Sequence, residues 1–254
     1  MNRGCDIIRV DGVTAGYGDK VVLEEVNFSV GEGEIFVILG GSGCGKSTLM
    51  RHIIGLETPW KGSVTIDGVD ITDCGDQDYQ QVLRKIGVLF QGAALFGSMT
   101  LAQNVALPIQ QYAGLRGVDL DSLVRMKLCM VDLDGHEPLY PSELSGGMRK
   151  RAGLARALAL NPKIVFLDEP SAGLDPITSA EIDELILSIN RTIGTTMVIV
   201  THELESIFKL AQRVIMLDAA AKGIIAEGTP QELKNKSENE TVRNFFNRRS
   251  PDRR

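Results

Sequence analysis

A glycine-rich segment is the part of this sequence that most directly indicates chemistry. It lies between an apolar run, 35–39, and a stretch with helical periodicity, and it reads Gly40, Gly41, Ser42, Gly43, Cys44, Gly45, Lys46, Ser47 and Thr48. Glycines there let consecutive backbone N–H groups converge on phosphate oxygens, and the N-terminus of the following helix adds partial positive charge. Lys46 is expected to reach the terminal phosphates of a nucleotide, and the Ser47 hydroxyl is placed for a magnesium ion. The strand before the loop and the helix after it make a chance glycine-rich turn the weaker interpretation.

Two adjacent carboxylates end another apolar run later in the chain. Asp168 and Glu169 follow the hydrophobic residues 164–167, and ligand groups in a parallel sheet sit at the carboxyl ends of strands. Asp168 is therefore predicted to face the magnesium ion, and Glu169 to face an attacking water. Alone, such a pair is more often a solvated strand end, so this prediction depends on the glycine-rich loop.

A second candidate phosphate site lies between these two motifs. Ser145 is predicted to cap a helix whose first N–H groups are unobstructed, because Gly146 and Gly147 have no side chains. One nucleotide cannot easily contact both phosphate sites if they lie apart in the fold. We therefore expect a head-to-tail pair of chains, in which each nucleotide is held by the loop of one chain and this helix of the other.

The three motifs, in this order, resemble those of the ABC ATPase family over about residues 6–235, and the Leu-Ser-Gly-Gly at 144–147 matches the family signature. The resemblance implies an α/β P-loop NTPase fold with a mainly parallel central sheet, an antiparallel β layer and an inserted helical subdomain at about 93–158. It also implies hydrolysis of ATP with Mg²⁺. The expected partners are a second copy of the chain and an integral-membrane permease.

Roles for single residues follow from the same resemblance. Nucleotide contact is implied for the glycine-rich loop, for Tyr17, which would stack on adenine, and, at the dimer interface, for Ser145, Gly146, Gly147 and Asp175. Magnesium contact is implied for Ser47, Gln91 and Asp168, and Gln91 would also relay the nucleotide state to the permease. Catalytic roles are implied for Lys46, Glu169 and His202, with His202 contacting the γ-phosphate and orienting Glu169. Taken singly, Tyr17, Gln91 and His202 each have a purely structural alternative.

The residue after the signature narrows the resemblance. Met148 stands where the family usually has glutamine. Together with segments 90–96, 175–177 and 201–207, it resembles the Mla-type ATPases. Those work with MCE-domain proteins and small accessory subunits in phospholipid transport at a bacterial cell envelope. We therefore expect phospholipid cargo, with an importer of small polar solutes as the alternative.

An apolar cluster follows Gln91 and has two interpretations. Its members are Ala94, Leu95, Phe96, Met99 and Leu101. They could belong to the core, or they could form a groove for a cytoplasmic helix of the permease.

Composition and charge exclude some classes of protein. A net charge of −6 and a pI near 5.2 argue against binding of nucleic-acid phosphates. ABC-type ATPases of DNA repair or translation also fit poorly, because only about 100 residues separate Lys46 from Ser145 and there is one cassette. The four cysteines are scattered, which indicates a reducing compartment. With no signal peptide and no apolar run of about 20 residues, we expect a cytoplasmic protein, peripheral on the cytoplasmic face of the inner membrane through its permease.

Hydrophobic periodicity predicts alternating strands and helices. Strands are expected at 7–10, 21–30, 34–39, 63–66, 86–90, 164–167, 197–200, 213–217 and 223–226. Helices are expected at 46–54, 77–83, 101–111, 120–131, 146–160, 179–190 and 203–210. These elements form an ATPase domain over 1–236, followed by a tail, 237–254.

The tail is expected to contain one short amphipathic helix and to fray at its end. Ser237 and Glu240 have the spacing of a capping box, and Val242, Phe245 and Phe246 would share one apolar face. A helix this short needs something to cover that face. The sequence leaves open whether the cover is the chain's own surface or the partner subunit.

Overall fold

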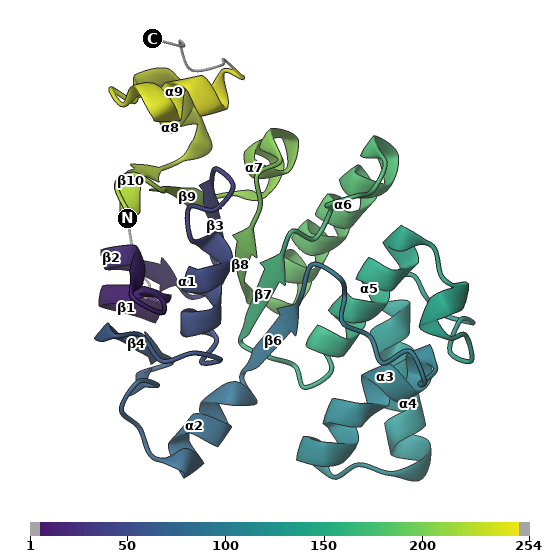
Figure 1. Ribbon diagram of the computed structural model, residues 1–254. Coiled ribbons are helices and arrows are strands. Elements are labelled where there is room, and N and C mark those ends of the chain that lie inside the picture. The colour runs from purple at the N-terminus through teal and green to yellow at the C-terminus, as the bar shows by residue number, and fades with distance from the viewer. Residues whose placement is uncertain (1–5, 249–254) are drawn as a thin grey trace. The chain divides into compact units, whose positions relative to one another are not determined.

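The computed structural model describes residues 6–248 and divides into two compact units. The first unit comprises the residues up to Val82 and those from Val198 onward, and the second comprises Leu83–Met197 (Figure 1). The second unit is wider than the helical segment expected at 93–158. Within the described range, no helix combines the length and the apolar character needed to cross a bilayer.

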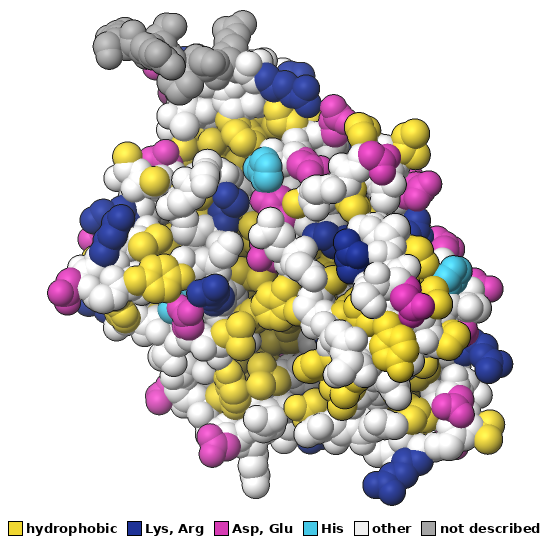
Figure 2. Space-filling view, turned by 45° about the vertical axis from the view of Figure 1, so that its right-hand side comes forward, with side chains coloured by type: hydrophobic (Ala, Val, Ile, Leu, Met, Phe, Trp, Pro, Cys, Tyr) yellow, Lys and Arg dark blue, Asp and Glu magenta, His cyan; other side chains and the backbone are white. Residues whose placement is uncertain are grey.

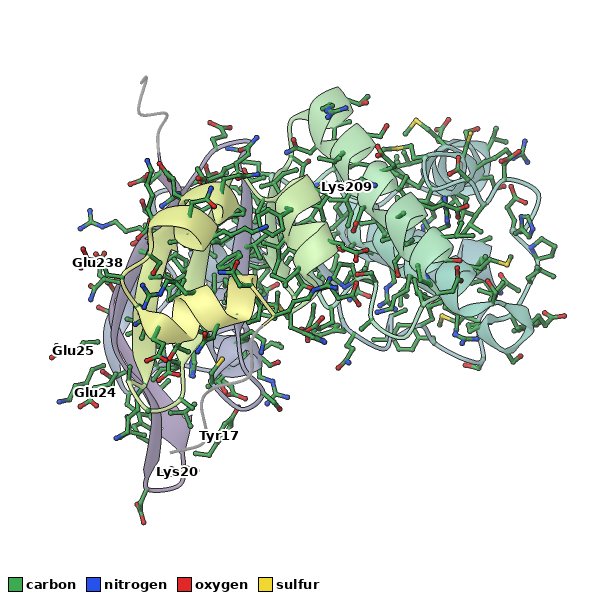
Figure 3. All side chains as sticks on the ribbon, turned by 90° about the horizontal axis from the view of Figure 1, so that it is seen from above. Tyr17, Lys20, Glu24, Glu25, Lys209 and Glu238 are labelled. Carbon is green, nitrogen blue, oxygen red and sulfur yellow. The ribbon has the colours of Figure 1, made fainter. Side chains whose placement is uncertain are left out.

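An antiparallel sheet forms one layer of the first unit. Its strand order is β2-β1-β4-β5, with bounds β1 (Asp6–Tyr17), β2 (Lys20–Gly31), β4 (Lys61–Ile66) and β5 (Val69–Asp70). The hairpin of β1 and β2 closes at the pair Tyr17 and Lys20, and Figure 3 shows both side chains at that end of the hairpin. Burial alternates along β2 from Val26 to Gly31, as expected for a strand with one covered face, whereas β1 contains runs of consecutive buried residues.

A second sheet supplies the buried strand that leads to the glycine-rich loop. In the first unit its strands lie in the order β10-β9-β3-β8, with bounds β3 (Ile35–Gly40), β8 (Thr196–Val200), β9 (Arg213–Asp218) and β10 (Gly223–Gly228). β3 runs parallel to β9, and every residue of β3 is buried. The helices of this unit are α1 (Lys46–Ile53), α2 (Asp76–Leu83), α7 (Leu204–Leu210), α8 (Pro230–Lys236) and α9 (Glu240–Phe246), of which α2 ends at the boundary.

The second unit pairs a short parallel ladder with a group of helices. Strands β6 (Ile86–Leu89) and β7 (Ile164–Asp168) are parallel and in register from one end to the other. The helices are α3 (Leu101–Pro108), a π-helical turn (Ile109–Ala113), α4 (Gly117–Cys129), a 3₁₀ turn (Pro141–Glu143), α5 (Gly146–Ala157) and α6 (Pro176–Ile193). The helix expected at 101–111 therefore changes character at Pro108.

Two elements of the first unit were not expected from the sequence, and one predicted cap is wrong. The strand β5 has two residues, which is too few for periodicity to detect, and α8 lies in a polar segment. Helix α9 does form, but its N-cap is Asn239, whose Oδ1 accepts from the backbone N–H groups of Thr241 and Val242. Ser237, expected to be the cap, instead follows the last turn of α8.

The apolar face of α9 docks on the chain's own surface. Val242 and Phe246 are 0% and 3% exposed. The ring of Phe246 lies edge-on to that of Phe208 in α7, with 5.8 Å between centroids, and Lys234 of α8 stacks on the same Phe208 ring. The tail contains the expected short helix as far as Phe246, and residues 249–254, at the end that is expected to fray, lie outside the described range.

This docking predicts that the tail contributes to stability. We expect Phe246→Ala to lower the free energy of unfolding by about 3 kcal/mol, because a buried ring is lost, and truncation after Lys236 to lower it at least as much. Urea denaturation of the isolated chain measures both. Arg243→Ala is the control, since Arg243 lies on the exposed face of the same helix. Equal unfolding midpoints for Phe246→Ala and the unmodified chain would show that α9 is not part of the cooperative fold.

Candidate active site

The glycine-rich loop joins the end of β3 to the start of α1 and needs glycine at two positions for steric reasons. A Cβ at Gly40, where φ is +152°, would collide with the carbonyl of Leu217 and lie 2.6 Å from the sulfur of Cys44. A Cβ at Gly45, the N-cap of α1 with φ of +100°, would lie 2.8 Å from Leu23 Cδ2. At Gly41, in contrast, a Cβ would meet no atom within 4 Å. The loop therefore combines a tightly packed base with an open outer face.

The ammonium group of Lys46 folds back onto the first residues of this loop. Its Nζ donates to the carbonyl oxygens of Gly40 and Gly41 at 2.9 and 3.0 Å. Burial raises the pKa of the neighbouring Cys44 thiol, which keeps that side chain uncharged although the charge of Lys46 opposes the shift. A glycine-rich loop with an open outer face, a helix start and one cation beside it fits the phosphates of a nucleotide.

Tyr17 lies beside the loop in the first unit. Its hydroxyl is 3.0 Å from Oγ1 of Thr48, the third residue of α1, and 49% of the residue is exposed. The hydrogen bond ties the hydroxyl to α1 and leaves the ring accessible. That arrangement suits a ring predicted to stack on a base.

His202 follows β8 in an irregular segment of the same unit. The backbone N–H of Thr201 donates to the carbonyl of Ile38 in β3, and Thr201 Oγ1 accepts from the N–H of Glu203. The preceding residue is thus anchored to the strand that carries the glycine-rich loop, while His202 itself is exposed.

The second unit brings Gln91 and Glu169 together. Gln91 follows β6, and Glu169 follows Asp168, the last residue of β7. Lys150 of α5, which the sequence analysis did not single out, donates to the backbone carbonyls of both. Glu169 is buried and Asp168 is half-buried. A basic residue shortly after the signature was the only sign of this contact in the sequence.

The predicted signature begins α5, as expected. Ser145 is the N-cap, and its Oγ accepts from the N–H of Met148 at 3.2 Å. A Cβ at Gly147 would lie 2.6 Å from Thr178 Cγ2 in α6, and one at Gly146 would lie 3.1 Å from Leu174 Cδ2. These glycines therefore permit close packing of the start of α5 on its neighbours.

Asp175 caps the adjacent helix α6. Its carboxylate accepts from the hydroxyl of Thr178 at 2.6 Å and from the N–H groups of Thr178 and Ile177. These hydrogen bonds, with the Thr178 hydroxyl first, lower the pKa of Asp175. The carboxylate therefore stays ionised at neutral pH.

The predicted site residues divide between the two units. The first unit holds Tyr17, the glycine-rich loop and His202, and the second holds Gln91, Asp168, Glu169, Ser145, Gly146, Gly147 and Asp175. Among residues 6–248, no group of three or more His, Cys, Asp and Glu side chains is arranged to hold a metal ion. The predicted ligands of Mg²⁺ include only one carboxylate, which is typical of an ion that is bound mainly through substrate phosphates and water.

Comparison with known proteins gives consistent relatives. The sequence profile of the family described as "ABC transporter" matches residues 23–172. The ATP-binding protein mkl of Mycobacterium tuberculosis, a probable ribonucleotide transport protein, is 41% identical over 95% of this chain and 67% of its own length. The methionine import ATP-binding protein MetN of Caulobacter vibrioides is 40% identical over 91% of this chain and 69% of its own. The phospholipid transport ATP-binding protein MlaF of Haemophilus influenzae is 39% identical over 92% and 87%.

Solved structures confirm the predicted fold. The ATP-binding cassette MJ0796, as a dimer in a post-hydrolysis state with ADP and Pi, matches with a TM-score of 0.79 and 33% identity, over 87% of this chain and 98% of that one. CbiO1 of Clostridium perfringens, described as part of the transporter complex cbiONQ, matches with a TM-score of 0.82 and 28% identity over 91% of each chain.

Proposed function

Because this chain belongs to the ABC transporter family, as its ATPase domain, we propose that it powers phospholipid transport at a bacterial cell envelope. Binding of ATP with Mg²⁺ and ATP hydrolysis come with the family. Phospholipid as the cargo is the more specific part of the proposal. It rests on the similarity to MlaF, because the match extends over 87% of that protein. Met148 after the signature supports the same assignment.

An importer of small solutes is the second candidate. The names of mkl and MetN, at 41% and 40% identity, refer to ribonucleotides and methionine. Cargo recognition in either case would lie in the membrane partner, so the ATPase fold alone does not separate the two.

We propose the following roles for the chain's own groups in hydrolysis. Lys46 exchanges its bonds to the loop carbonyls for bonds to the β- and γ-phosphates, and the loop amides hold the same oxygens. Glu169 accepts the proton of the attacking water, and His202 holds the γ-phosphate side. Tyr17 stacks on adenine. Ser47, Gln91 and Asp168 would hold Mg²⁺, which supplies neutralisation of phosphate charge when bound.

A second copy of the chain and a membrane permease are the proposed partners. Ser145, Gly146, Gly147 and Asp175 would contact the nucleotide held by the second copy, since MJ0796 forms a dimer and CbiO1 is part of a larger transporter complex. The permease would place the chain on the cytoplasmic face of the inner membrane, with MCE-domain and small accessory subunits beyond it. On the face seen in Figure 2, basic and acidic side chains are interspersed, so this face offers no extended basic area for nucleic acid.

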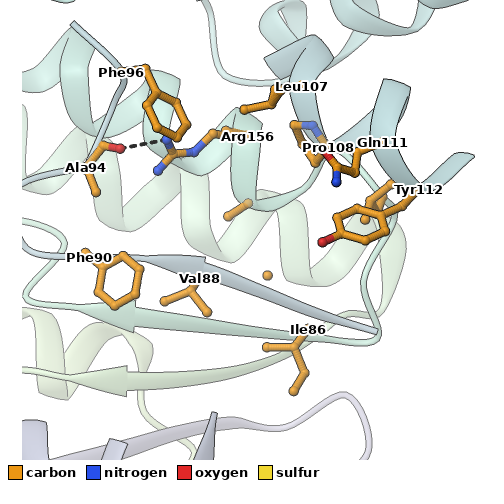
Figure 4. A pocket seen from close by; sticks show the side chains of 13 residues that line it. Ile86, Val88, Phe90, Ala94, Phe96, Leu107, Pro108, Gln111, Tyr112 and Arg156 are labelled. Atoms are coloured by element: carbon orange, nitrogen blue, oxygen red, sulfur yellow. Dashed lines mark hydrogen bonds between the residues drawn. The ribbon is translucent and has the colours of Figure 1, made fainter. Parts of the chain in front are cut away.

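A groove on the second unit is the proposed docking site for a cytoplasmic helix of the permease. It has a volume of about 480 Å³ and is lined by Phe90, Ala94, Phe96, Leu107, Tyr112 and Arg156, among others (Figure 4). Phe96 and Tyr112 are 49% and 44% exposed, and exposed aromatic rings in a groove suit the apolar face of a helix. Of the cluster after Gln91, Ala94 and Phe96 line the groove, whereas Leu101 is fully buried in the core.

The catalytic proposal predicts a strong effect of one substitution. Glu169→Gln should keep ATP binding and lower the rate of hydrolysis by roughly 10²-fold or more, because the amide cannot accept the proton of water. It should also accumulate an ATP-bound dimer, which size-exclusion chromatography with ATP detects. A variant that hydrolyses ATP at the normal rate would remove Glu169 from this role.

The docking proposal predicts uncoupling without unfolding. Phe96→Asp places a charge in the groove, so we expect the basal ATPase rate to stay the same and co-purification with the permease to be lost. Val118→Asp is the control, because Val118 is 80% exposed in the same unit and does not line the groove. If Phe96→Asp bound the permease as well as Val118→Asp did, the docking site would lie elsewhere.

The cargo proposal is tested with the complex purified from its own membranes. After reconstitution into proteoliposomes, the complex should move fluorescent phospholipid when ATP is added, and the complex with Glu169→Gln should not. Methionine and ribonucleotides should leave its ATPase rate unchanged. Stimulation by either solute, without ATP-dependent phospholipid transfer, would favour the importer.

A further inference from the structure

Lys150 is a buried cation to which the proposed mechanism gives no role. It is 6% exposed, and its Nζ donates to the backbone carbonyls of Gln91 and Glu169 at 2.6 and 2.7 Å. These carbonyls lie just beyond β6 and β7, which are adjacent parallel strands. A buried ammonium needs acceptors, and a carbonyl beyond the end of a strand needs a donor. The Lys150 side chain gains two acceptors in this way, and it gives a donor to one carbonyl beyond each of the two strands.

The backbone of Glu169 needs such support. Its φ of +47° is left-handed, a conformation that a non-glycine residue keeps only where its surroundings hold it. The carbonyl of Glu169 accepts from Lys150 and, at 3.2 Å, from the N–H of Ala172. Because the direction of the carboxylate follows from this backbone conformation, the ammonium contributes to aiming the proposed base.

The same face of α5 also holds the segment after Gln91. Arg156 donates to the carbonyls of Ala93 and Ala94 at 2.9 and 2.7 Å, and both alanines have left-handed φ values of +59° and +49°. Figure 4 shows Arg156 with its hydrogen bond to Ala94 and its position beneath Phe96. At Gly153, halfway between the two cations, a Cβ would lie 2.6 Å from Leu89 Cδ1. The face of α5 that contains positions 150, 153 and 156 thus packs against the end of β6 and the loop beyond it.

We propose that Lys150 is a positioning residue for hydrolysis, which fixes the backbone of Gln91 to that of Glu169. Lys150 is also connected to Ser145, because Ser145 caps the same helix, α5. The two residues are separated by about 7.5 Å of helix rise. The signature serine, the loop that leads to the groove and the proposed base are therefore held by one rigid helix. This inference rests on the proposed roles of Gln91 and Glu169, and it adds the group that keeps them in register.

Two substitutions at Lys150 separate hydrogen bonding from packing. Lys150→Met keeps most of the length of the unbranched side chain and removes every donor, so kcat should fall about tenfold or more. KM and the Kd for a fluorescent ATP analogue should change less than about twofold, because the proposed role of Lys150 is to hold the backbone of Gln91 and Glu169 and not to bind phosphate. Lys150→Gln keeps two N–H donors and should restore most of kcat. This split between kcat and KM, with rescue by a neutral donor, is not expected of a residue that only stabilises the fold.

A second buried lysine of the same unit provides the matched control. Lys127 is 1% exposed, its Nζ donates to Asn161 Oδ1 at 2.5 Å, and burial lowers its pKa. Lys127→Met should lower the melting temperature and leave kcat unchanged. The proposal is overturned if Lys150→Met keeps normal kcat, or if Lys127→Met at matched stability loses as much kcat as Lys150→Met.

Glu169→Gln, assayed beside these variants, distinguishes the possible failures. If Glu169→Gln is inactive and Lys150→Met is fully active, only the positioning role fails. If Glu169→Gln itself turns over normally, the proposed base and the inference resting on it both fail. All assays use the basal ATPase activity of the intact chain, so neither result depends on the identity of the cargo.

Discussion

Backbone carbonyls at the carboxyl ends of parallel strands have no partner in the ladder, and this constraint organises the chemistry of the chain. In each unit, cations on the helices donate hydrogen bonds to several of these carbonyls. Lys46 serves the end of β3, while Lys150 and Arg156 serve the segments after β6 and β7. The cations that donate to carbonyls at the carboxyl ends of the strands also make this end of the sheet positively charged. A polyanionic ligand therefore binds well at the same end. The fold and the site therefore depend on the same side chains.

Lys46 and Lys150 differ in how readily they can give up their hydrogen bonds to backbone carbonyls. Lys46 has its two bonds on an open loop, so phosphate oxygens can replace carbonyls at little cost. Lys150 is buried, and moving its ammonium would break its hydrogen bonds to two backbone carbonyls and cost the solvation that they provide to a buried charge. The first lysine is suited to binding ligand and the second to holding geometry.

The features that the sequence predicted correctly are local. The glycine-rich loop, the Ser145 cap and the strand before Asp168 are each recognisable within about ten residues, because turn chemistry and periodicity act at that range. Lys150 was missed because its acceptors lie 59 and 19 residues away, and a lysine early in a helix looks like a surface charge. The left-handed Ala93, Ala94 and Glu169 were missed for a related reason, since the side chains that hold their carbonyls, Lys150 and Arg156, are distant in the sequence. At the tail, Ser237 and Asn239 both suit a cap, and Asn239 is used because Ser237 still belongs to the end of α8.

Gly147 shows how a predicted nucleotide contact and a packing requirement coincide. Asp175 holds the N–H and the hydroxyl of Thr178, which fixes the methyl group of Thr178 against Gly147. The cap of α6 thereby sets how closely α6 approaches the first turn of α5, the helix that Ser145 caps. The start of α5 and the start of α6, which are both predicted to face a second copy of the chain, are thus packed against each other. A nucleotide held there would meet a surface whose shape is already determined, so its binding energy would not be spent on ordering that surface.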